Sequence, residues 1–243
     1  MPPETSLVIH GHFYQPPRED PWTGEVPEQP SAAPFHDWNE RITAECYGPN
    51  TAVKLATADG DILINTFEHL SFNVGPTLMS WLEQHHRDVY DAIVEADRRG
   101  GRAIAQGYGH AILPLCDDRD LRTQIRWGVA DFRHRFGRQP EGMWLPETAV
   151  SERVLAVLAE EGLRFTILEP SQLRSVRPLD GSGGWHDLLD DSGGVREGVA
   201  IDRPFRWQHP ARPDLTLDLV VYDGGIAHAL AFGDPSGHEI VSQ

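Results

Sequence analysis

The stretch Gly142-Met143-Trp144-Leu145-Pro146-Glu147 decides the fold of this chain. Its apolar residues form a short run after a turn, which is typical of a buried strand. Glu147 follows at the carboxyl end of that strand, and Ser151 is a suitable N-cap for a helix that begins soon afterwards. In α/β proteins, charged groups at the carboxyl ends of strands commonly belong to active sites. Glu147 is therefore a candidate catalytic residue, and a surface glutamate in a loop is the alternative interpretation.

The alternation of strands and helices extends in both directions from this stretch. Short apolar runs predict strands at 7–9, 62–65, 103–106, 165–168 and 215–222. Amphipathic patterns and capping residues predict helices over 76–99, 118–136 and 151–162. This order predicts an α/β fold of mostly parallel strands with the helices packed outside them.

Several residues suited to catalysis or binding fall just after the predicted strands. In parallel α/β folds, the carboxyl ends of the strands share one face. We therefore expect these residues to meet in one pocket, although they are far apart in the sequence. They are His10, His12, His110, Glu147, Glu169 and Asp223.

The composition argues against several classes of partner. The chain has 243 residues, with 21 Lys and Arg against 37 Asp and Glu and a formal net charge of −16. This charge disfavours nucleic acids and anionic membranes, which require a basic surface, and it suits a neutral substrate. Cys46 and Cys116 are too few for a disulfide framework or a cysteine zinc site. Because no signal-peptide or membrane-span pattern is visible, a soluble cytoplasmic protein is expected.

Two carboxylates at one end of such a fold are suited to the cleavage of glycosidic bonds. One attacks the anomeric carbon, and the other protonates the leaving oxygen and later activates the incoming water or sugar hydroxyl. Glu147 and Asp223 are the candidates for this pair. The sequence Asp223-Gly224-Gly225 is also a turn signal, so a structural role for Asp223 is the alternative.

The histidines allow two interpretations. His10 and His12, at positions i and i+2, point the same way and together with His110 form a candidate metal site. Alternatively, they bind sugar hydroxyls, while tryptophans such as Trp144 offer flat apolar faces to the sugar ring. An H-x-H pair by itself does not distinguish the two.

Four motifs, in order along the chain, resemble those of glycoside hydrolase family 57. The first is His10-Gly11-His12-Phe13-Tyr14-Gln15-Pro16, and the second is Gly109-His110-Ala111-Ile112-Leu113-Pro114-Leu115. The third is the stretch that ends at Glu147, and the fourth is Tyr222-Asp223-Gly224-Gly225. The segments 18–22 and 36–41 are similar to a poorly characterised subgroup of that family.

The resemblance implies a fold, a mechanism and a set of site residues. The fold is a (β/α)7-type barrel, and the enzyme is a retaining hydrolase or transglycosidase acting on α-glucans, of the amylase, branching or glucanotransferase type. It requires no metal or other cofactor. The implied nucleophile is Glu147 and the implied acid/base is Asp223. The implied substrate-binding residues are His10, His12, Gln15, His110 and Trp144.

The chain departs from the family pattern in two ways. Phe13 and Tyr14 separate His12 from Gln15, whereas His-Gln-Pro is contiguous in better-known members. The helical region that follows the barrel in this family is missing, so a longer full-length protein is expected to supply it. We therefore expect residues 1–243 to form a single barrel domain truncated at its C-terminus. It would have a long loop at 16–38 and a Gly/Ser-rich insertion at 171–199.

Two other functions remain open from the sequence. One is a metal-dependent carbohydrate deacetylase or related hydrolase that uses His10, His12 and His110. The other is a glycan-binding barrel without activity. The Asp-Asp pair common near the first strand of deacetylases is absent, and the intact Glu147 and Asp223 argue against a purely binding function.

Overall fold

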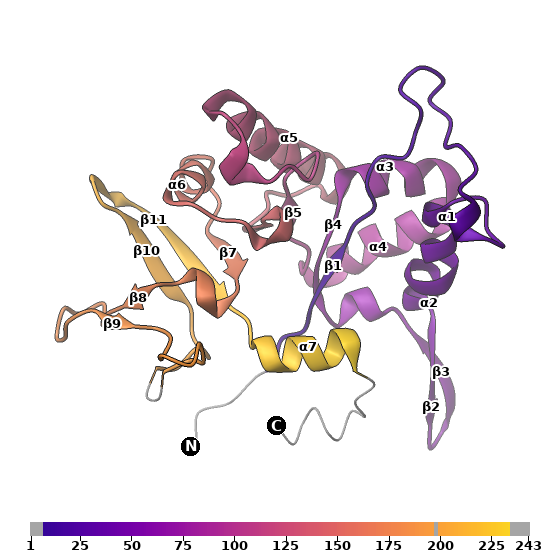
Figure 1. Ribbon diagram of the computed structural model, residues 1–243. Helices are drawn as coiled ribbons and strands as arrows, with labels where there is room; N and C mark the ends of the chain where they lie inside the picture. The colour runs from indigo at the N-terminus through magenta and orange to yellow at the C-terminus, as the bar shows by residue number, and fades with distance from the viewer. Residues whose placement is uncertain (1–6, 197–198, 234–243) are drawn as a thin grey trace. The chain divides into compact units, whose positions relative to one another are not determined.

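The computed structural model describes residues 7–196 and 199–233, which belong to two compact units (Figure 1). Unit 1 comprises Met1–Ala111 and Cys116–Pro140. Unit 2 comprises Ile112–Leu115 and Glu141–Gln243. The assignment of residues 1–243 to a single barrel domain remains a prediction.

A pair of parallel strands, β1 (His10–Phe13) and β4 (Ser71–Val74), positions the histidines of unit 1 (Figure 1). The strand expected at 7–9 is displaced by three residues. Leu7 and Val8 are 58% and 73% exposed, and pairing with β4 begins only at His10. The histidines therefore lie within the strand rather than after it, and both point to the same face.

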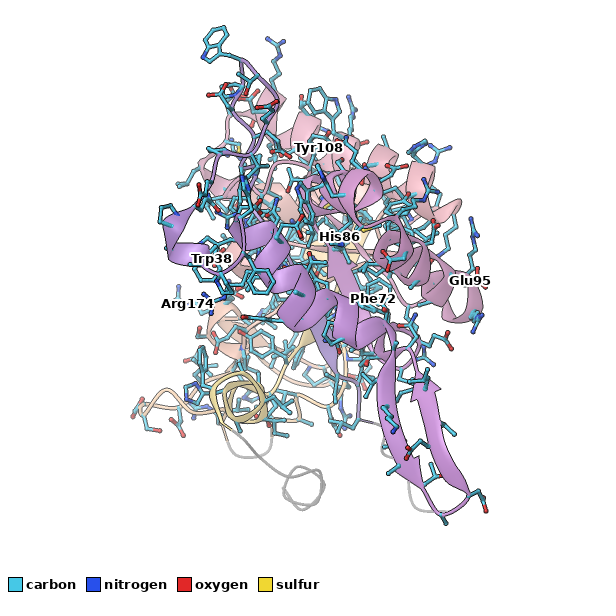
Figure 2. All side chains as sticks on the ribbon, turned by 90° about the vertical axis from the view of Figure 1, so that its right-hand side faces the viewer. Trp38, Phe72, His86, Glu95, Tyr108 and Arg174 are labelled. Atoms are coloured by element: carbon cyan, nitrogen blue, oxygen red, sulfur yellow. The ribbon has the colours of Figure 1, made fainter. Side chains whose placement is uncertain are left out.

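The apolar run at 62–65 was expected to be a strand of the parallel sheet, and this expectation is wrong. It contributes to β3 (Gly60–Ile64), which pairs antiparallel with β2 (Val53–Thr57) in a two-stranded hairpin. Figure 2 shows this hairpin extending away from the helices of unit 1. Leu55, Ile62 and Leu63 are exposed on it. The parallel partner of β1 is instead β4, which is less apolar and was not predicted.

The helix expected over 76–99 is divided at His86. Its backbone leaves the helical region there (φ −137°, ψ 64°), and its Nε2 lies 2.9 Å from Oε2 of Glu40. The two resulting helices are α3 (Pro76–His85) and α4 (Arg87–Gly100). Unit 1 also contains α1 (Trp38–Ile42), the π-helix η2 (Thr43–Tyr47), α2 (Gly48–Thr51) and β5 (Ala105–Gln106).

The longest helix, α5 (Asp118–Phe136), has the bounds expected from the sequence. Asp117 caps it by accepting a hydrogen bond from the backbone N–H of Asp120 at 2.8 Å, and Gly137 ends it in the left-handed conformation. A Cβ atom on Gly128 would overlap the backbone carbonyl of Gln106, so glycine allows α5 to approach β5. The close packing of Gly128 against Gln106 holds the carboxyl end of β5 against α5.

Unit 2 is built on a mostly parallel sheet in the order β10-β11-β7-β6. The central strand β7 (Phe165–Leu168) pairs parallel with β6 (Gly142–Trp144) on one side and with β11 (Arg212–Val221) on the other. β10 (Phe205–His209) adds an antiparallel edge. Thr166, fully buried on β7, donates its hydroxyl to the carbonyl of Met143 at 2.8 Å and so joins the two strands.

Two helices follow strands of this sheet. α6 (Glu152–Glu160) is capped by Ser151, as expected, and buries Val154, Leu155 and Leu158. α7 (Gly224–Phe232) follows β11. The segment 171–199 contains the short antiparallel strands β8 (Ser175–Val176) and β9 (His186–Asp187).

The predicted fold class is confirmed in its main features: the protein is α/β, and the sheet of unit 2 is mostly parallel. No closed barrel is formed by the strands of the described residues. Over the same residues, none of the helices combines the length and the apolarity that a membrane span requires.

Candidate active site

Glu147 lies three residues after the end of β6, within a single 3₁₀ turn, Pro146–Thr148 (η5). Glu147 and Thr148 both have positive φ angles, 55° and 52°. Non-glycine residues adopt this left-handed conformation at a cost of about 1–2 kcal/mol each. Such strained backbone clusters at functional sites, where surrounding contacts maintain it. The Glu147 side chain is exposed.

Gln172 maintains this turn from the next strand connection. Its Nε2 donates a hydrogen bond to the carbonyl of Thr148 at 2.6 Å, and its Oε1 accepts one from the backbone N–H of Glu169 at 2.8 Å. One side chain thus joins the loops that follow β6 and β7. We expect it to stabilise the left-handed conformation at residues 147 and 148.

Replacing Gln172 with methionine removes both hydrogen bonds and preserves the size of the side chain. We expect the free energy of unfolding to fall by about 1–2 kcal/mol, because two partly buried backbone groups lose their partner. The control is Gln208→Met, which removes one hydrogen bond from an exposed amide to the carbonyl of Pro213. Its effect should stay within about 0.5 kcal/mol in the same denaturant titration. Equal losses for both variants would contradict this role for Gln172.

Asp223 lies two residues beyond β11 and is the N-cap of α7. Its Oδ1 accepts a hydrogen bond from the backbone N–H of Ile226 at 2.9 Å. The structural role anticipated for Asp223 is therefore present, as a helix cap. The carboxylate remains exposed, so capping does not prevent it from meeting a ligand.

Glu169 lies between these two carboxylates along the sheet, directly after β7. Its side chain is engaged in its own turn, where Oε2 accepts hydrogen bonds from the backbone N–H and the hydroxyl of Ser171. Burial, and to a lesser extent the charge of Glu169, raises the pKa of the Tyr222 hydroxyl. Glu169 thus serves as the cap of the turn Pro170–Gln172 (η6).

The register of the sheet aligns β6 and β11, the strands that precede Glu147 and Asp223, on either side of β7. Gly142 on β6 and Asp218 on β11 are both paired with Phe165 on β7, and each candidate carboxylate follows five residues later, beyond the end of its strand. Neighbouring strands lie about 4.8 Å apart, so the backbones of β6 and β11 are separated by roughly 10 Å across β7. Two side chains that incline toward β7 can therefore approach each other over its carboxyl end.

A network of hydrogen bonds joins the histidines of unit 1. His10 and His12 are paired in the strand register with Ser71 and Asn73. The His10 ring lies 3.0 Å from the Ser71 hydroxyl through Nδ1 and 3.0 Å from Asn73 Oδ1 through Nε2. Asn73 Nδ2 donates to His12 Nδ1 at 2.9 Å and also to Gln106 Oε1. Asn73 and Gln106 are buried polar residues near the ends of β4 and β5, and neither was predicted as a site residue from the sequence.

Both rings are neutral at pH 7. Burial lowers the pKa of His10, which the hydrogen bond to Asn73 only partly offsets. Desolvation and the nearby His110 lower the pKa of His12 to about 4, although part of His12 remains open to solvent. Neutral imidazoles bind polar, uncharged groups through one N–H and one lone pair.

His110 and Tyr14 complete the histidine cluster. The Tyr14 and His110 rings are stacked with centroids 3.7 Å apart, and Nε2 of His110 lies 3.4 Å from Nε2 of His12. His110 has a positive φ angle of 55°, the same unusual backbone conformation as Glu147. The three rings form a compact aromatic surface on unit 1.

Gln15 has both ends of its amide engaged within unit 1. Its Oε1 accepts a hydrogen bond from Arg18 at 2.8 Å, and its Nε2 donates to the Tyr47 hydroxyl at 3.2 Å. In this conformation it connects the segment 16–38 to η2. A role for Gln15 in binding substrate remains a prediction.

The predicted site residues are distributed over the two units. His10, His12, Gln15 and His110 belong to unit 1, whereas Trp144, Glu147 and Asp223 belong to unit 2. Trp144 is the half-buried last residue of β6. Convergence of both groups on one pocket remains a prediction. Among residues 7–196 and 199–233, no three His, Cys, Asp or Glu side chains are arranged to hold a metal ion.

Comparison with known proteins places the chain in a family. The sequence model of glycosyl hydrolase family 57 matches residues 7–197. Because this match covers most of the chain, the protein belongs to glycosyl hydrolase family 57. The family resemblance noted from the four motifs is thereby confirmed.

Individual relatives are similar over part of their length. The chain is 28% identical to alpha-amylase 1 of Dictyoglomus thermophilum over 162 residues, which are 65% of this chain and 24% of that protein. It is 24% identical to a 4-alpha-glucanotransferase of Thermococcus litoralis over 155 residues, 62% of this chain and 23% of that protein. The chain thus spans about a quarter of the length of these relatives.

The fold is shared with a solved structure. The crystal structure of an exo-type maltose-forming amylase from a Pyrococcus species superimposes with a TM-score of 0.64 at 11% sequence identity. The superposition covers 95% of this chain and 37% of that one. At this level of identity the likeness establishes the fold.

Proposed function

We propose that the protein is a retaining glycoside hydrolase or transglycosidase that acts on α-glucans, with Glu147 as nucleophile and Asp223 as acid/base. The observation that supports this assignment most strongly is that the two carboxylates follow the carboxyl ends of the two strands that flank β7. Membership of the family and the relatives named as an amylase and a glucanotransferase support the substrate class.

The proposed reaction proceeds in two steps. In the first, a Glu147 carboxylate oxygen bonds to the anomeric carbon while the glycosidic C–O bond breaks and Asp223 gives its proton to the leaving oxygen. In the second, the Asp223 carboxylate takes a proton from water or a sugar hydroxyl, whose oxygen attacks the anomeric carbon and releases Glu147. Two substitutions at the same carbon retain its configuration. No metal or cofactor takes part.

Separate groups are assigned to the catalytic steps and to the binding of the sugar. Both Glu169 and Asp223 cap a turn or helix, but Glu169 is half-buried and Asp223 is exposed, which favours Asp223 as the partner of Glu147. The neutral histidines and Tyr14 provide hydrogen bonds and flat surfaces for an uncharged sugar.

The proposed function is tested by incubating the purified protein with linear α-1,4 glucans, an α-1,6-branched glucan and maltooligosaccharides. We expect cleavage or transfer of α-1,4-linked glucosyl units, with products that initially have the α configuration in proton NMR spectra. New reducing ends would identify hydrolysis, whereas new chain lengths without them would identify transfer, and new α-1,6 linkages would identify branching. Initial products of the β configuration would contradict a retaining mechanism. Binding of glucans without any turnover would contradict an enzymatic function.

A further inference from the structure

Ser71 determines which groups donate and which accept in the hydrogen-bond network around His10. The Ser71 oxygen lies 3.0 Å from Nδ1 of His10 and 3.4 Å from the carbonyl oxygen of Arg102. A hydroxyl has a single hydrogen, and 3.4 Å is long for a hydrogen bond between two oxygens. We therefore assign the Ser71 hydrogen to the shorter contact, with Nδ1 of His10 as its acceptor, rather than to the carbonyl of Arg102.

The tautomer of His10 in turn determines the orientation of the Asn73 amide. A neutral imidazole that accepts at Nδ1 has its proton on Nε2. His10 Nε2 thus donates to the oxygen of Asn73, which it meets at 3.0 Å. This contact fixes the orientation of the amide, because its oxygen faces His10 and its nitrogen faces the other side.

The Asn73 nitrogen then determines the protonation of His12. Its two hydrogens are directed at Nδ1 of His12, at 2.9 Å, and at Oε1 of Gln106. His12 Nδ1 must therefore accept, and the proton of the neutral ring resides on Nε2. Asn73 is completely buried, so water cannot compete for either of its ends.

We propose that Asn73 is a positioning residue that holds His12 in the tautomer protonated at Nε2, so that His12 donates a hydrogen bond to an oxygen of the bound sugar. Without sugar, this N–H faces Nε2 of His110 at 3.4 Å, and the sugar oxygen would replace that contact. The identity of the acceptor as a sugar oxygen rests on the proposed function. The tautomer itself follows from the contacts within unit 1.

The same tautomer makes His12 an unsuitable metal ligand through Nε2. A metal requires the lone pair of the coordinating nitrogen, and the opposite ring nitrogen of a ligating histidine usually donates to a carbonyl or carboxylate. Here Nδ1 of His12 faces an N–H group instead. His10 is protonated at the same ring nitrogen, because its Nε2–H is directed at Asn73. The network therefore favours a sugar-binding role for this pair over a metal-binding role.

The proposal is tested by measuring the tautomer directly. In protein labelled with ¹⁵N at histidine, long-range ¹H–¹⁵N correlation spectra at pH 7 distinguish protonated from unprotonated ring nitrogens. Signals that disappear in His12→Gln identify the His12 ring. We expect Nε2 protonated and Nδ1 unprotonated in the unsubstituted protein. A His12 ring protonated at Nδ1 would overturn the proposal, whatever the protein does with glucans.

The variant Asn73→Asp tests the cause of the tautomer. An ionised carboxylate only accepts hydrogen bonds, so it should draw a proton to Nδ1 of His12. The matched control is Asn50→Asp, which makes the same change where the amide donates to the carbonyl of Cys46. The control should leave the His12 signals unchanged. A folded Asn73→Asp protein with an unaltered His12 ring would contradict the role of Asn73, and if this variant does not fold, the spectrum of the unsubstituted protein decides.

An activity measurement separates this proposal from the proposed function. If His12 donates to the sugar, Asn73→Asp should lower kcat/KM for maltooligosaccharides by about 2- to 10-fold, the effect of one lost neutral hydrogen bond. The unsubstituted protein could show the expected tautomer while Asn73→Asp leaves kcat/KM unchanged. This result would retain Asn73 as a positioning residue and reject the contact between His12 and the sugar. Absence of glucan activity in the unsubstituted protein would reject the proposed function alone.

Discussion

Replacing Glu147 with alanine is expected to lower kcat for α-glucans by about 10⁴–10⁶-fold, the range found when a member of a covalent catalytic group is removed. Without the carboxylate, no glycosyl–enzyme intermediate forms. Stability should change little, because alanine at this position adopts the same left-handed backbone as glutamate. The measurement is steady-state kinetics on maltooligosaccharides, accompanied by a denaturant titration.

Azide provides the control for the role of Glu147. A small anion can occupy the space left by the missing carboxylate and attack an activated α-glucosyl fluoride from the face opposite the leaving group. The expected product is the β-glucosyl azide. Glu152→Ala, which removes an exposed carboxylate in the first turn of α6, should retain full activity. Normal activity of Glu147→Ala on natural glucans would reject Glu147 as the nucleophile.

The second large effect is expected at Asp223, and it should depend on the leaving group. Asp223→Asn preserves an amide oxygen that can cap α7, since asparagine is as good an N-cap as aspartate. It removes the proton donor. We expect kcat/KM for natural glucans to fall by about 10²–10⁴-fold, whereas an activated glucosyl fluoride, which needs no protonation, should react nearly normally in the first step.

Azide also identifies the step that is lost in Asp223→Asn. Its product is expected to have the anomeric configuration opposite to that formed by Glu147→Ala. In Asp223→Asn the intermediate on Glu147 still forms, and azide attacks it without general base assistance. The expected product is therefore the α-glucosyl azide, in contrast to the β product of Glu147→Ala. Equal losses on natural and activated substrates, in a folded protein, would show that Asp223 is not the acid. Glu169 on the intervening strand would then be the next candidate.

The parts of the fold that local signals determine could be predicted from the sequence. The bounds of α5, the capping of α6 by Ser151 and the strand β7 follow from periodicity and capping residues. By contrast, β4 escaped prediction because Ser71 and Asn73 interrupt its apolar pattern, and their partners on β1 are about sixty residues away. The more apolar run at 62–64 belongs to an exposed hairpin. Apolar content alone does not reveal which runs become buried.

The residues of the candidate site that depend on local signals could also be predicted from the sequence. The position of Glu147 after a strand and the common direction of His10 and His12 follow from the alternation of side chains along a strand. Asn73, Gln106 and Gln172 could not be anticipated, because their roles depend on hydrogen bonds between segments distant in sequence. The single signal that could have indicated Asn73 and Gln106 is their polarity near the ends of apolar runs.

The central claim, that Glu147 forms the covalent intermediate, is tested most directly by trapping that intermediate. A ring-fluorinated α-glucosyl fluoride slows both steps of a retaining reaction, and its reactive leaving group allows the intermediate to accumulate. The labelled protein is digested with protease and the peptides are sequenced by mass spectrometry. We predict one glucosyl group per protein, attached to the side chain of Glu147. A label on Glu169 or any other residue, or turnover with inversion and no label, would contradict the account.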